Sequence, residues 1–232
     1  MKVKLLIVFA VLILLFINFS AIYLNISWLA YSAYILFFLS ATLFYLKRIN
    51  LKNGYFFLFL LCTFSAFIFR LFHGQWFCDE VSLVLLSTGN FALILEGSKY
   101  IEIKNASLPM QFFFVFLIGI NAVLLFTHVY ELQNYMSSTI KFYLYFLYYL
   151  NLLILSIVAF LYYLNSYSKK SMYFISLALT LLFADVLRDM DVFYLKDFSV
   201  EIAENSLRFA AAFFVIKFFS TKEKQLRLVN FI

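Results

Sequence analysis

Apolar stretches of about twenty residues recur along almost the whole chain, and they leave few folds open to it. A helix needs about 20 apolar residues to cross a bilayer. Of the 232 residues, 66% are hydrophobic and only 13% are charged, about half the charged share of an average soluble domain. We therefore predict an all-α polytopic membrane protein, a single domain built as a bundle of eight transmembrane helices. The predicted helices cover residues 4–24, 27–46, 54–73, 76–96, 109–131, 140–164, 171–193 and 199–219.

The first segment resembles a signal peptide, because Lys2 and Lys4 precede a long apolar run. The best cleavage site would follow Ala21, and it would place Phe19 where a small residue is required. We therefore expect the segment to remain uncleaved as a first transmembrane helix.

Basic residues in the predicted loops indicate the orientation, since cytoplasmic loops carry an excess of Lys and Arg. Twelve Lys and Arg residues lie at one side of the predicted bundle, and the other side carries only Arg70, Lys141, Arg188 and Lys196. Both termini are therefore expected in the cytoplasm, and usage rich in Phe, Tyr, Ile, Lys and Asn suggests a bacterial cytoplasmic membrane. The basic residues on the cytoplasmic side are Lys2, Lys4, Lys47, Arg48, Lys52, Lys99, Lys104, Lys169, Lys170, Lys222, Lys224 and Arg227.

Acidic side chains gather at the ends predicted to be external. Either carboxylates simply avoid the basic cytoplasmic loops, or a polar cavity opens outward, and the sequence leaves both explanations open. Asp191 and Asp197 flank a turn beside Lys196, and we expect both to be solvated and to contribute little to stability. The acids at these ends are Asp79, Glu80, Glu131, Asp185, Asp189, Asp191, Asp197, Glu201 and Glu204, with His73, His128 and Arg208 in the same half.

Charged side chains also lie inside the last two apolar segments. Asp185, Arg188 and Asp189 share one helix face, and Glu204 and Arg208 have the favourable acid-first i,i+4 order. An unpaired carboxylate at membrane depth costs roughly 2.5–3.5 kcal/mol. The cluster is therefore either a functional site or a self-neutralising network between two antiparallel helices.

Other polar residues are weaker candidates. Asp79 and Asn90 are eleven residues apart, about three helical turns, so they lie on nearly the same stripe. A metal site could be assembled from His73, His128, Asp79 and Glu131, but no paired spacing supports one, and we predict no metal and no cofactor. The net charge of +6 lies mostly in short loops, which argues against a nucleic-acid partner.

Short motifs in the fourth to eighth predicted segments resemble the signatures of the YhhN family, the eight-helix integral membrane proteins that include the lysoplasmalogenases. One is a helix of small residues followed by a helix with a histidine, another an Asp after a small residue, and the last an aromatic-Ala pattern ending in a basic residue. The matching residues are Ser87-Thr88-Gly89-Asn90, Ala122 to His128, Ala184-Asp185, and Arg208-Phe209-Ala210 through Lys217.

The resemblance implies hydrolysis of the vinyl ether bond of a lysoplasmalogen-type lysophospholipid, a membrane lipid, to a fatty aldehyde and a glycerophospho-headgroup. A carboxylic acid protonates the alkene carbon, and water adds to the resulting oxocarbenium ion. Asp185 is the implied acid, and Asp79 is the candidate for a second catalytic carboxylate. The implied substrate-binding residues are Asn90, His128, Arg188, Glu204 and Arg208, with Arg188 or Arg208 on the lipid phosphate.

One departure from the family leaves the activity open. The family's first Asp is Asn90 in this chain, and an amide cannot transfer a proton as a carboxylic acid does. Either Asp79 replaces it, or the chain has lost the chemistry. The alternative is a non-catalytic integral membrane protein that binds lipid or a membrane partner on the same scaffold. A small-solute transporter is a third possibility, without the broken helices that such folds favour.

Overall fold

The protein is all-helical over the ranges that the computed structural model describes, residues 2–24, 26–45, 53–72, 77–101, 108–136, 138–194 and 196–223. A short 3-10 helix, Gln133–Tyr135, follows α5, and a π-helical turn, Met190–Tyr194, extends α7. Each predicted segment corresponds to one long helix, with ends that differ by a few residues. The long helices are α1 (Lys2–Tyr23), α2 (Ser27–Tyr45), α3 (Gly54–Leu71), α4 (Cys78–Ser98), α5 (Leu108–Leu132), α6 (Thr139–Ser166), α7 (Lys169–Asp189) and α8 (Phe198–Ser220).

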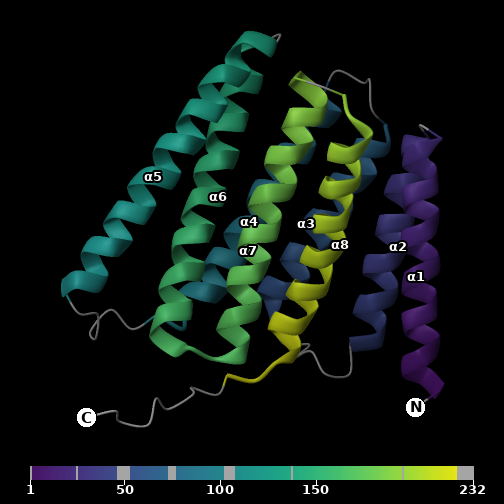
Figure 1. Ribbon diagram of the computed structural model, residues 1–232, viewed down its shortest axis with the longest axis horizontal. Helices are drawn as coiled ribbons and strands as arrows, with labels where there is room; N and C mark the ends of the chain where they lie inside the picture. Colours follow the sequence, from purple (N-terminus) through teal and green to yellow (C-terminus); the bar gives the residue numbers. More distant parts are fainter. Residues whose placement is uncertain are drawn as a thin grey trace.

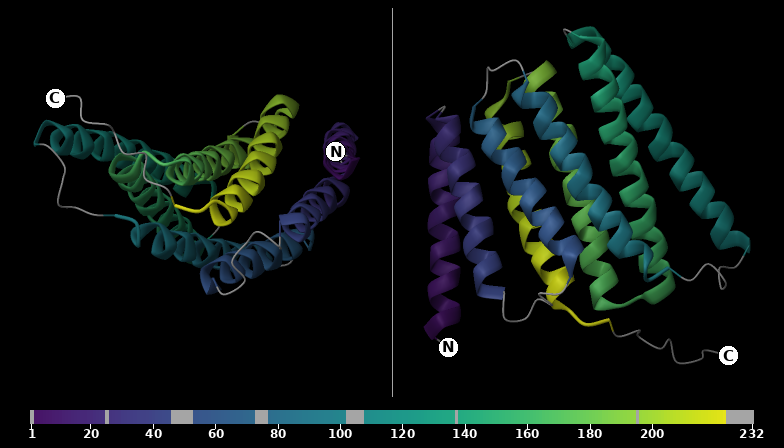
Figure 2. Two further views of the ribbon diagram at one scale, coloured as in Figure 1. Left: turned by 90° about the horizontal axis from the view of Figure 1, so that it is seen from below. Right: turned by 180° about the vertical axis from the view of Figure 1, so that it is seen from behind.

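Six of the helices form a closed ring, in the order α2, α3, α4, α6, α7, α8 and back to α2. The pairs α7–α8 and α3–α4 have the most extensive contacts, and both are joined by short connections. Helix α1 lies outside the ring against α2 and α8, and α5 lies outside it against α6 (Figure 1). In the view along the helices, α7 and α8 face the row formed by α2, α3 and α4 (Figure 2). The ring therefore has an interior that all six helices can line.

Four helices are long and apolar enough to cross a membrane: α3, α4, α6, and α7 with its π-helical extension. The chain is thus a membrane protein. Eight membrane-spanning helices were predicted, and four of the described helices meet this requirement of length and hydrophobicity. Helix α8 does not qualify because Glu201, Glu204, Arg208 and Lys217 interrupt it, and the described parts of α1 and α2 offer only shorter apolar stretches.

The connection between α7 and α8 is more ordered by hydrogen bonds than the sequence suggested. Asp197 is the N-cap of α8, and its Oδ1 accepts a hydrogen bond from the Ser199 backbone N–H at 2.7 Å. The Asp197 N–H in turn donates to Oδ1 of Asp191 at 3.3 Å. The expectation that Asp197 contributes little is therefore wrong, because an N-cap stabilises a helix by about 1 kcal/mol.

Aromatic rings pack closely at the end of the bundle where α1 begins and α8 ends. Phe174 is fully buried between Tyr162 and Phe218, with ring centroids 5.8 Å and 4.7 Å away. Gly97 of α4 lies against this stack, and a Cβ atom there would come within 2.5 Å of the Phe174 ring. Gly97 thus leaves room on α4 for the Phe174 ring of α7.

We predict that Gly97→Ala lowers the free energy of unfolding by about 1–3 kcal/mol, because the buried Phe174 ring has no space into which it can move. Gly119→Ala is the control, since nothing lies within 4 Å of a Cβ at that position of α5. Unfolding in detergent is measured by the reaction of the buried thiols of Cys62 and Cys78 with a fluorogenic reagent. Equal melting temperatures for the two variants would contradict this account of the packing.

Candidate functional site

Two cavities lie in the interior of the ring, one above the other along its axis. The inner cavity has a volume of about 20 Å³, enough for one water molecule. Its lining includes Asn90, Tyr148, Asp185 and Arg208, and all six ring helices contribute to it. The outer cavity has a volume of about 90 Å³ and lies at the end of the ring where α3 ends and α4 and α6 begin. Arg188 lines the outer cavity and contacts Asp185 of the inner one.

The Asp185 carboxylate is surrounded by donors. Nη2 of Arg208 donates to Oδ1 at 3.0 Å, and Nη1 of Arg188 lies 3.3 Å from the same oxygen. The Tyr148 hydroxyl donates to Oδ2. Asp185 is only 1% exposed, so these partners replace most of the water that would surround a free carboxylate.

Asp189 lies one turn further along α7 and has a similar environment. Nε and Nη2 of Arg188 donate to its Oδ1 at 3.1 Å and 2.9 Å, and the Tyr149 hydroxyl donates to Oδ2 at 2.5 Å. Nε2 of His128, on α5, lies 3.3 Å from the Tyr149 hydroxyl and 3.6 Å from Oδ2 of Asp189. Tyr149 and His128 thus connect the interior of the ring to the helix outside it.

The predicted pairing of the last two helices is confirmed. Nε of Arg208 donates to Oε1 of Glu204 at 2.7 Å, while its Nη2 reaches across to Asp185 on α7. Glu204 and Arg208 are 7% and 5% exposed. Arg208 and Arg188 therefore each contact two carboxylates. Arg208 contacts Glu204 and Asp185, and Arg188 contacts Asp185 and Asp189.

The other predicted site residues divide between the two cavities. Asn90 lines the inner cavity with Asp185, although 95 residues separate them in the sequence. Asp79 lines the outer cavity instead, where its Oδ2 lies 3.3 Å from Nζ of Lys141. Asp79 and Lys141 are 38% and 20% exposed, in contrast to the fully buried Asp185. Asp79 thus belongs to the rim of the outer cavity and does not share the inner cavity with Asn90.

The described part of the chain does not support a metal site of the kind considered from the sequence. No group of three or more His, Cys, Asp or Glu side chains is close enough there to hold a metal ion. His73, one member of that set, lies outside the described residues.

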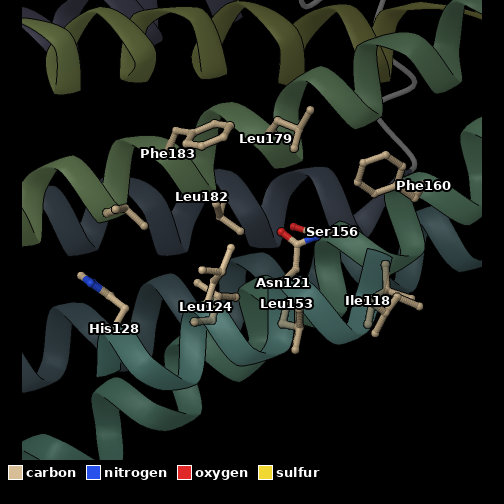
Figure 3. Close-up of a pocket in the computed structure, with 13 residues that line it drawn as sticks. Ile118, Asn121, Leu124, His128, Leu153, Ser156, Phe160, Leu179, Leu182 and Phe183 are labelled. Atoms are coloured by element: carbon tan, nitrogen blue, oxygen red, sulfur yellow. The ribbon is translucent and has the colours of Figure 1, made fainter. Parts of the chain in front are cut away.

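A large apolar groove runs along the outside of the ring between α5, α6 and α7. Its volume is about 310 Å³, and its lining is mainly Leu, Ile, Val and Phe. His128 lies at one end, Asn121 near the middle, and Phe160 toward the other end (Figure 3). The groove therefore begins beside the charged network and continues toward the middle of the bundle.

Sequence reasoning missed Tyr148, Tyr149 and Arg70. Tyrosine is common along the whole chain, and nothing in the sequence singles out these two, but both are buried and donate to Asp185 and Asp189. Arg70 was treated as an orientation signal, yet it is 6% exposed and lines the outer cavity. A cation at the end of an otherwise apolar segment was the signal that could have identified it.

We predict that Arg188→Met destabilises the protein by about 3–5 kcal/mol, because Asp189 loses its only cationic partner among the described Arg and Lys residues. Lys169→Met is the control, since Lys169 is exposed at the other end of α7. Thermal unfolding in detergent measures both, and Arg188→Met with Asp189→Asn should recover part of the loss. An Arg188→Met variant as stable as wild type would show that the network does not depend on this bridge.

No protein-family model, curated protein or solved structure matches the chain. The geometry of the cavities, the network and the groove is therefore the basis for a functional proposal.

Proposed function

We propose that the chain is an integral membrane protein with eight transmembrane helices and both termini in the cytoplasm, and that it binds a single-chain, lysophospholipid-type amphiphile. Two observations support the topology. Helix α1 begins and α8 ends at the same end of the bundle, where α4 also ends and α7 begins (Figure 1). Lys99 and Lys222 follow the ends of α4 and α8, and Lys169 begins α7. The bacterial cytoplasmic membrane is the proposed location.

The observation that carries the binding proposal is the continuity of the apolar groove with the buried charged network. The lining runs along α5 from Ile118 to His128, about 15 Å at 1.5 Å per residue. That length is roughly half of the 30 Å hydrocarbon core, which is the depth of one leaflet. One alkyl chain of an outer-leaflet lipid therefore fits the groove in length and polarity.

The polar end of the groove gives the amphiphile its direction. His128 reaches the Tyr149 hydroxyl and Asp189, and Asp189 is held by Arg188. A lipid headgroup at this end meets hydrogen-bond donors and acceptors, at the depth where the charged residues of the protein gather. A lipid inserted in the opposite direction would place its headgroup among apolar side chains, which is costly.

Hydrolysis of a vinyl ether lysophospholipid is the second candidate, and one observation favours it. Asn90 and Asp185, the two positions singled out by the resemblance to the YhhN family, line one cavity with room for a water molecule. Arg208 and Arg188 both contact Asp185 in the unliganded protein. A lipid phosphate that draws either arginine away would leave the Asp185 carboxyl group less well paired and free to act on the substrate.

We predict that Leu124→Trp weakens lysophospholipid binding at least tenfold, because the larger ring fills the groove. Leu124 is 62% exposed, so the fold should tolerate the change. Leu43→Trp is the matched control, since Leu43 is 67% exposed on α2, away from the groove. Binding of a radiolabelled lysophosphatidylethanolamine to the purified protein in detergent measures both. Equal affinity in the two variants would rule out the groove as the binding site.

We predict that wild-type protein in detergent releases fatty aldehyde from a lysoplasmalogen and that Asp185→Asn lowers the rate at least about a hundredfold, the scale of general acid catalysis. The variant keeps the shape of the side chain and most of its hydrogen bonds, but removes its acidic proton and its charge. Normal insertion of the variant into the membrane is the control. A variant as active as wild type would remove Asp185 from the mechanism, and no release by wild type would leave binding as the function.

A further inference from the structure

Arg70 differs from Arg188 and Arg208 because no carboxylate of the described residues forms a salt bridge with it. Arg70 is only 6% exposed. Within the described residues its Nη1 has no hydrogen-bond partner. Its guanidinium stacks over the Phe67 ring at 5.4 Å from the centroid, on a ring that Arg208 also approaches at 5.6 Å. A buried guanidinium nitrogen without an acceptor destabilises the folded protein, so its retention calls for an explanation.

The outer cavity lies where this acceptor is missing. Arg70 lines it together with Arg188, Lys141 and Asp79, and Tyr31 and Tyr145 add hydroxyl groups. The surrounding cations outnumber the single carboxylate of Asp79. A volume of about 90 Å³ is several times the 10–15 Å³ that one water needs, so a small polyatomic anion fits.

The other cations of the network are already occupied. Arg208 donates to Glu204 and Asp185, and Arg188 contacts Asp185 and Asp189. The three arginines carry as much positive charge as Asp185, Asp189 and Glu204 carry negative charge. This balance of charge does not, however, give Nη1 of Arg70 a hydrogen-bond acceptor. What the described residues lack is an acceptor for Nη1 of Arg70.

We propose that the outer cavity binds the tetrahedral oxyanion of a phosphate group, with Arg70 as its principal ligand and Lys141 as its second cation. A guanidinium presents two parallel N–H donors to such an oxyanion, and a lysine supplies a point charge. The phosphate belongs either to a lipid headgroup or to a free phosphate ion, which share this chemistry. The inference is independent of the amphiphile groove, because it rests on a different cavity.

The test compares wild type with Arg70→Met by thermal unfolding in a phosphate-free maltoside detergent. Inorganic phosphate is added at constant ionic strength in one arm, and lysophosphatidic acid is added to the micelles in the other. Wild type should gain at least about 2–4 °C in melting temperature with one or both ligands. Arg70→Met should gain nothing with inorganic phosphate, and the lipid arm compares the two proteins in the Leu124→Trp background, so that binding in the groove does not contribute to the gain. Without ligand, Arg70→Met should be at least as stable as wild type, because it buries no unpaired charge. Lys99→Met, at the opposite end of the bundle, should respond as wild type does.

The outcomes separate the two sources and the two proposals. A gain with both ligands assigns the site to free phosphate, and a gain with the lipid alone assigns it to a headgroup. No gain with either ligand, an equal gain in Arg70→Met, or a lower melting temperature of unliganded Arg70→Met would overturn the proposal, the last by showing that Arg70 is a structural counter-charge. Leu124→Trp should keep the response to inorganic phosphate whether or not the groove binds lipid, since that groove does not include Arg70.

Discussion

Pairing of buried charge is the constraint on which the rest of this structure depends. A carboxylate removed from water is tolerated only when cations and hydrogen-bond donors replace the lost solvent. Arg188 and Arg208 do this for Asp185, Asp189 and Glu204, and the pair between Arg208 and Asp185 joins α8 to α7. The tyrosines of α6 complete the coordination, so three helices are fixed relative to one another by a single network. Such a network is costly to assemble for stability alone, because apolar side chains of similar volume often serve equally well.

The position of the network makes it useful. It lies between a water-sized inner cavity, a larger outer cavity and an apolar groove that follows α5. His128 and Tyr149 form the only connection described between the groove and Asp189 within the part of the chain that the structure covers. An amphiphile with its chain in the groove would therefore place its polar end beside groups whose contacts it can change. This arrangement suits a protein that recognises a lipid by both its chain and its headgroup.

The sequence predicted the helices far better than the site. Long apolar runs located all eight helices, because length and hydrophobicity are local properties, and i,i+4 spacing correctly paired Glu204 with Arg208. The partners that come from distant segments were not predictable in the same way. Nothing in the run around Tyr148 and Tyr149 indicates that they face Asp185 and Asp189, since tyrosine is common along the whole chain. The stripe shared by Asp79 and Asn90 was a sound inference, but depth along the ring axis separates them into two cavities.

Photocrosslinking tests the central claim most directly. A lysophospholipid that carries a diazirine near the end of its alkyl chain is bound to the purified protein, and the labelled residues are identified by mass spectrometry. The account predicts labels on groove residues of α5, α6 and α7, such as Ile118, Phe160 and Leu179, and loss of these labels when unlabelled lysophospholipid competes. Labels spread over the exposed faces of all the helices, with no effect of the competitor, would contradict it.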